Sequence, residues 1–145
     1  MAKFKFRLQG YFDIKQKLED KAKQDYGMAM VILERERRER ARLENERQTK
    51  LEEFRDSLSV RIKPSELQGF NNYIEVLKKG IVQQNERVKK AKELTEIRRA
   101  ALSEAMKQRK MLEKLHDNAK TEFVKESIKA EQKEVEELTN YKFLR

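Results

Sequence analysis

Apolar residues recur every three or four positions along most of the chain, in two runs separated by one break. The first run consists of Leu8, Tyr11, Leu18, Ala22, Ala29, Ile32, Leu33, Leu43, Leu51, Phe54 and Leu58. The second consists of Leu67, Phe70, Ile74, Leu77, Ile81, Val88, Ala91, Leu94, Ala101, Leu102, Ala105, Leu112, Leu115 and Ala119. These seams are narrower than the apolar face of a globular-protein helix, so they indicate coiled-coil helices.

The break between the two runs contains Pro64, the single proline of the chain. A proline ring disfavours helical backbone in the residue before it, and Ser65 with Gln68 forms a capping-box pattern just after it. We therefore expect one helix over about 5–60, a turn over about 61–64 and a second helix over about 65–141. Because a short loop makes consecutive helices antiparallel neighbours, the sequence predicts an all-α coiled-coil hairpin spanning residues 1–145 as a single domain.

A turn centred near residue 62 fixes the register of the two helices, because the numbers of facing residues then sum to about 124. The expected pairs are Phe54 with Phe70, Leu43 with Ile81, Leu33 with Ala91, Ala29 with Leu94, Leu18 with Ala105 and Tyr11 with Leu112. The second helix is longer, so residues beyond about 121 form a C-terminal overhang with no partner in the hairpin. Since an isolated helix is marginally stable in water, we expect this overhang to bind a partner or fray.

The composition supports helices rather than a globular core. Charged residues make up 42% of the chain, hydrophobic residues 37%, and there are four glycines and no cysteine. The N-terminus lacks the apolar run of a signal peptide, and no stretch is long and apolar enough to span a membrane. These features predict a soluble protein, with the cytosol as its default compartment.

Residues that could carry chemistry are scarce. His116 is the single histidine, so the chain offers no catalytic triad and no histidine-based metal cluster, and we expect His116 to be a solvated helix residue. No glycine-rich phosphate loop is present, and two helices provide no concave site for a substrate. The sequence therefore predicts a non-enzymatic protein without a metal or cofactor.

Three surfaces could contact partners. Lys78–Lys110 contains eleven bases and four acids, so it is a solvated face, a site for an acidic protein or, least favoured because aromatic residues are missing, a nucleic-acid site. Met28, Met30 and Val31 should point outward, either as a docking patch or packed under a bent second helix. The aromatic residues near the turn could close the hairpin or anchor a partner.

The charged stretch over 34–47 places polar residues on the seam, at Glu36, Arg40 and Arg47. These layers bury little apolar area, so we expect the middle of the hairpin to be its softest part. The long side chains can cover the seam with their aliphatic stems while their charges stay in water.

Three motifs, in this order, resemble the FliJ family of flagellar type III export proteins. The first is Phe4-x-Phe6-Arg7-Leu8-Gln9 with Ile14-Lys15 and Glu19. The second is Phe70-Asn71-Asn72-Tyr73-Ile74, followed by Leu77 and Ile81. The third, over 131–138, resembles the family's Gln-Lys-x-hydrophobic-Asp-Glu signature, although Val135 and Glu136 replace the usual Leu-Asp.

The resemblance implies a stalk that links an export ATPase ring to the membrane export gate and cycles export chaperones. The implied gate-contacting residues are Phe54, Tyr73, Leu77, Gly80 and Gln84. The implied ATPase-ring end comprises Phe4, Phe6, Leu8, Phe123, Ile128, Val135 and Leu138. The implied location is the cytoplasmic face of the inner membrane, reached only through partners, and no nucleic acid is expected. The alternatives are a generic coiled-coil scaffold or chaperone-like hairpin without an ATPase partner and, more distantly, a basic nucleic-acid binder.

Overall fold

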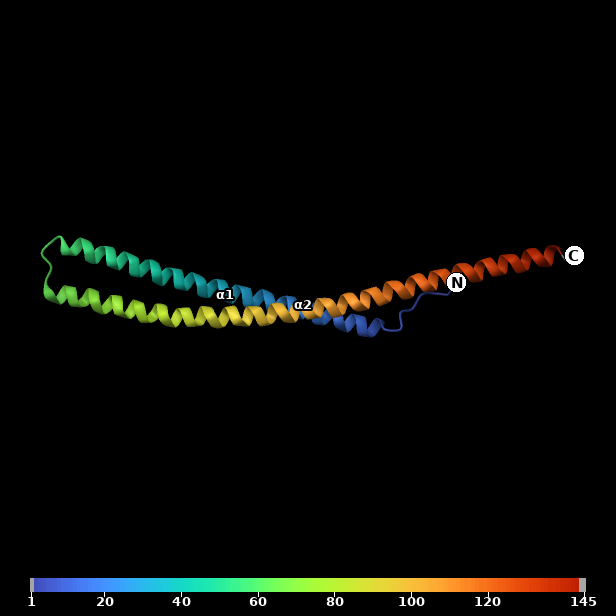
Figure 1. Cartoon of the computed structure of the whole chain (residues 1–145), viewed down its shortest axis with the longest axis horizontal. Helices are drawn as coiled ribbons and strands as arrows, with labels where there is room; N and C mark the ends of the chain where they lie inside the picture. The colour runs from blue at the N-terminus through green and yellow to red at the C-terminus, as the bar shows by residue number, and fades with distance from the viewer. Residues whose placement is uncertain (1, 144–145) are drawn as a thin grey trace. The chain divides into compact units, whose positions relative to one another are not determined.

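Two long helices account for most of the chain in the computed structural model, which describes residues 2–143. Helix α1 spans Gln9–Leu58 and helix α2 spans Pro64–Phe143, joined by the short connection 59–63 (Figure 1). The predicted all-α hairpin with a longer second helix is confirmed. None of the described helices is long and apolar enough to cross a membrane.

The ends of the helices differ from the predicted bounds for local reasons. Helix α1 begins at Gln9 rather than near residue 5, and the residues before it, 2–8, are not helical. At the connection, the carbonyl of Lys63 accepts hydrogen bonds from the amides of Glu66 and Leu67, at 3.0 and 3.2 Å. Pro64 is therefore the first helical residue, a position where its missing N–H costs nothing, and Ser65 is not the N-cap.

The described residues pack as two compact units. Unit 1 combines Met1–Ala22 with Leu102–Arg145, and unit 2 consists of Lys23–Ala101. Each unit contains a segment of both helices, and we describe each one separately.

The core of unit 2 is a narrow apolar seam. Leu33, Val88 and Ala91 are buried together, and Ile32 packs against them. Nearer the connection, the rings of Phe54 and Phe70 meet edge-on with their centroids 5.7 Å apart. Both observations confirm the register predicted for these layers.

The predicted seam is wrong at several layers by one residue. Leu94 is 38% exposed, and the neighbouring Thr95 is buried instead, donating a hydrogen bond to the carbonyl of Ala29 at 3.3 Å. In unit 1, Leu18 is exposed while Glu19 is buried. A polar residue can occupy a seam position when a partner satisfies it, and apolarity alone therefore misplaced these layers. The same shift leaves Tyr11 and Leu115 exposed, against prediction, and Leu58, the last residue of α1, is exposed as well.

Burial in this seam predicts where substitutions destabilise unit 2. We expect Leu33→Ala to lower the free energy of unfolding by about 2–3 kcal/mol, because it leaves a cavity beside Val88 and Ala91. The matched control Val82→Ala, at a residue 68% exposed, should change it by less than about 0.5 kcal/mol. Urea denaturation followed by circular dichroism measures both values, and equal losses would contradict this core.

Candidate functional site

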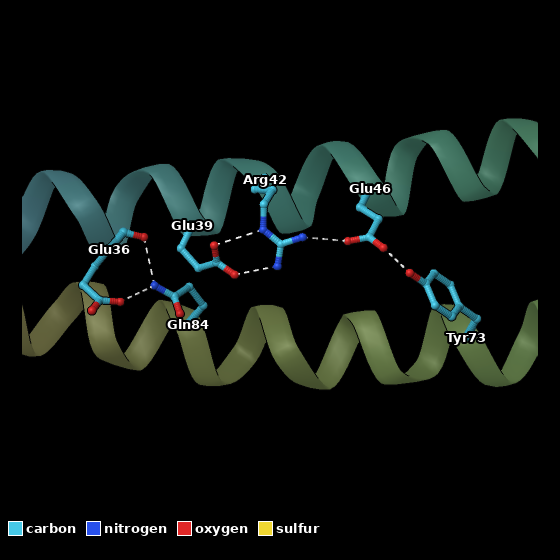
Figure 2. A network of polar contacts seen from close by, with 6 residues as sticks. All are labelled: Glu36, Glu39, Arg42, Glu46, Tyr73 and Gln84. Carbon is cyan, nitrogen blue, oxygen red and sulfur yellow. Dashed lines mark hydrogen bonds and ion pairs between the residues drawn. The ribbon is translucent and has the colours of Figure 1, made fainter.

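A polar network of side chains crosses between α1 and α2 within unit 2 (Figure 2). Arg42 donates two hydrogen bonds to the carboxylate of Glu39, at 2.7 and 3.0 Å, and one to Glu46 at 3.1 Å. The other carboxylate oxygen of Glu46 accepts a hydrogen bond from the hydroxyl of Tyr73 on α2. Glu46 therefore links a charge cluster on α1 to an aromatic residue on α2.

A second polar contact forms a layer of the seam itself. The side-chain amide of Gln84 donates to the backbone carbonyl of Glu36 at 2.9 Å and also to the Glu36 carboxylate. Gln84 is only 4% exposed, so these bonds compensate the cost of burying its amide. A buried polar pair of this kind fixes register, since sliding one helix along the other would leave it unsatisfied.

The ionisable groups of the network influence one another. The hydrogen bond to Glu46, together with partial burial and the Glu46 charge, raises the pKa of Tyr73. The hydrogen bond from Arg42 lowers the pKa of Glu39, and the nearby charge of Arg87 on α2 acts in the same direction. Both shifts favour the hydrogen-bonded forms, with Tyr73 protonated as a donor and Glu39 ionised as an acceptor.

The structure places the five predicted gate-contacting residues in environments that differ from one residue to the next. Leu77 and Gln84 are buried in the seam, and Phe54 is half-buried against Phe70. Gly80 is half-buried. A Cβ added at Gly80 would meet only the end of the Leu43 side chain, at 4.0 Å. Tyr73, at 39% exposure, is the member that offers most surface.

Residues 2–8 and His116 form an aromatic cluster in unit 1. The His116 ring lies 5.2–6.2 Å, centroid to centroid, from the rings of Phe4, Phe6 and Phe12, and Phe4 also meets Phe123 at 5.5 Å. The expectation that His116 is a solvated residue is therefore wrong. It occupies a seam position, and the non-helical segment folds against α2 to cover it.

The cluster also changes where the overhang begins. Phe123 was expected to be unpartnered, but it is half-buried against Phe4. Leu8 is half-buried as well, and with Phe4 and Phe123 it lines a hollow of about 500 Å³. Further along α2, every described residue from Ile128 to Phe143 is exposed, including Val135 at 61% and Leu138 at 64%.

Sequence reasoning missed two partly buried polar contacts of unit 1 that join α1 to α2. Arg109 donates to the buried carboxylate of Glu19 and also bonds Glu113, and Lys15 donates to Gln108 at 2.7 Å. The seven-residue spacing of the seam runs through Glu19 and Arg109, but spacing alone does not show that a charged residue at such a position finds a partner. Among the residues that the structure describes, no group of three or more His, Cys, Asp or Glu could hold a metal ion.

The Tyr73–Glu46 contact predicts an alkaline titration. Because the folded state raises the pKa of Tyr73, the contribution of this contact to stability is complete below the ordinary tyrosine pKa of about 10 and is lost as pH rises through the raised value. The tyrosinate absorbance of the wild type, less that of Tyr73→Phe, should give a midpoint above about 10. Glu46→Ala should return that midpoint towards the ordinary value; a wild-type midpoint already there would contradict the contact.

The fold has a counterpart among solved structures. Over 95% of this chain and 94% of the other, it matches a protein of Chlamydia trachomatis, CT670, described as a YscO homolog, with a TM-score of 0.53 and 21% identity. At this identity the match concerns the fold alone. None of the curated protein sequences compared with the chain matches it significantly.

The sequence itself matches a family model over almost its whole length, which confirms the resemblance carried by the three motifs. The model is that of the flagellar FliJ protein, and it matches residues 4–145. The chain therefore belongs to the FliJ family and is a non-catalytic component of the type III export apparatus.

Proposed function

We propose that this chain is the stalk of the export apparatus, linking the export ATPase ring to the membrane export gate and cycling export chaperones. In this proposal it acts at the cytoplasmic face of the inner membrane and reaches the membrane only through its partners. The observation that carries the proposal is the uncovered end of α2. In a hairpin whose helices had equal length, each helix would cover the apolar seam of the other. Here Ile128, Val135 and Leu138 stay exposed on α2.

Unit 1 has the properties expected of the ring-binding end. It contains the described residues of both ends of the chain, and its aromatic cluster holds the start of α1 and residues 2–8 against α2. This packing gives the overhang a rigid base at Phe123. Ordering a lone helix on binding costs conformational entropy, and a fixed base reduces the number of residues that must be ordered.

Unit 2 supplies the gate-binding end in this proposal. Tyr73 is held by Glu46 and lies beneath the ammonium of Lys50, 5.2 Å from the ring centroid. These contacts fix the orientation of its ring before any partner arrives. Partly exposed, preorganised aromatic residues are typical anchors of protein interfaces.

The first test is truncation after Ile128, which keeps Phe123 and its aromatic contacts while removing the exposed end. We expect the truncated chain to lose stimulation of the export ATPase ring, because the apolar surface that binds the ring is gone. Val135→Gln with Leu138→Gln should have the same direction of effect. Lys133→Ala with Glu137→Ala, on another face of the same helix, is the control and should keep stimulation; full stimulation by the truncated chain would refute the ring contact.

The second test separates binding at the gate end from folding. Tyr73→Ala should weaken binding of the gate protein, with helicity unchanged, because its ring is partly exposed. Leu77→Ala should instead lower the melting temperature, because Leu77 is only 6% exposed. Val76→Ala, at an exposed neighbour, is the control for both. If Tyr73→Ala reduces helicity and binding in parallel, the residue is structural, and the gate contact lies elsewhere.

A further inference from the structure

One side of unit 2 combines basic residues of α2 with apolar residues of both helices. Asp25 contacts Arg98 at 3.9 Å, and Glu39 lies close enough to Arg87 for that charge to lower its pKa. Asp25 and Glu39 are fourteen residues, about four turns, apart on α1, so both contacts lie on the same side of the hairpin. Residues spaced by threes, fours and sevens from these contacts share that side.

We call this side the basic–apolar face. Its apolar part includes Met28, 65% exposed, and the half-buried Ile32 of α1. On α2 it has a basic pair, Arg87 and Lys90, followed by an apolar pair, Leu94 and Ile97, which are 38% and 63% exposed. Lys90 forms no ion pair with any other residue that the structure describes. Arg87 lies beside Glu39, so the excess positive charge at this end of the face comes from Lys90, and the other end is apolar.

The overhang carries the complementary pattern. Its own apolar pair, Val124 and Ile128, is 46% and 49% exposed. An acidic pair follows, Glu131 and Glu134, and neither residue forms an ion pair within the described part of the chain. Residues 131–138 contain four glutamates against one lysine, so this segment is acidic in a chain whose formal net charge is +9.

The two patterns match in spacing as well as in charge. On the basic–apolar face the basic pair precedes the apolar pair by about seven residues, or two helical turns. On the overhang the apolar pair precedes the acidic pair by about the same distance. Antiparallel packing of the two helices therefore brings acid against base and apolar residues against apolar residues at the same time.

We propose that the overhang of one copy of this chain docks antiparallel on the basic–apolar face of a second copy. Two helical faces a few turns long bury less than the ~1,600 Å² of a standard stable interface, so the association is weak and depends on concentration. It also depends on salt, because charge pairs at the rim of an interface are screened.

The proposed contact would regulate the exposed end of α2. An overhang docked on a second copy cannot enter an ATPase ring at the same time, so self-association and ring binding compete. Only this consequence rests on the proposed function. The contact between copies stands on the charge and apolar patterns alone.

Charge reversal tests the contact with the full chain. We expect sedimentation velocity of the wild type to show an average mass that rises with concentration and falls with added salt. Arg87→Glu with Lys90→Glu should weaken association at least about tenfold, as should Glu131→Lys with Glu134→Lys. An equimolar mixture of the two variants should associate again, because each supplies the charge that the other has reversed.

Two further variants control for net charge, and circular dichroism controls for folding. Lys107→Glu with Lys110→Glu changes the charge as much as the first reversal, and Glu136→Lys with Glu137→Lys as much as the second; both should associate like the wild type. A wild type that stays monomeric at every concentration overturns the proposal, as does a mixture that fails to associate. Loss of association in the acidic-pair variant alone would mean that overhangs pair with each other, which also overturns it.

The ring assay separates this proposal from the proposed function. The basic-pair variant should still stimulate the ATPase ring, because its overhang is intact. If that variant self-associates normally but loses binding of the gate protein, the basic–apolar face belongs to another protein, and the contact between copies is refuted. Failure of the ring assay for the wild type would instead refute the stalk function and leave the contact between copies standing.

Discussion

The structure depends on a seam only one or two residues wide on each helix. Leu33, Val88 and Ala91 bury little area compared with the core of a globular domain, so a polar layer costs least when its buried groups are hydrogen-bonded, as all of them except the Nε of Arg47 are among the described side chains. The buried polar layers, Gln84 with Glu36 and Arg109 with Glu19, meet this condition. They also favour one register over others that differ by a heptad, which apolar contacts alone distinguish poorly.

The narrow seam ends differently in the two units. In unit 2 the chain reverses at Pro64, and the rings of Phe54 and Phe70 close the seam there. In unit 1, α1 begins at Gln9, and the preceding non-helical residues place Phe4 and Phe6 against His116. An extended segment can cover α2 beyond the start of α1, because it rises about twice as far per residue as a helix.

The proposed function rests on the surface that these contacts leave uncovered. Val135 and Leu138 are exposed on α2, and Tyr73 is oriented by Glu46 without being enclosed. In the proposed function, the protein couples its partners through exposed residues that are held at fixed positions. The Tyr73 and His116 clusters both provide such positions, one in each unit.

The sequence by itself determined the helices, the break at Pro64, the unequal lengths and the apolar layers such as Phe54 with Phe70, because helical periodicity and proline geometry are local properties. Only the tertiary structure decided that Glu19, Thr95 and His116 occupy the seam. Whether a polar side chain can be buried depends on a partner far away in sequence, such as Arg109 for Glu19 or Phe4 for His116. No local pattern contains that information, because a hydrogen bond or ring contact across the hairpin exists only after the two helices have met.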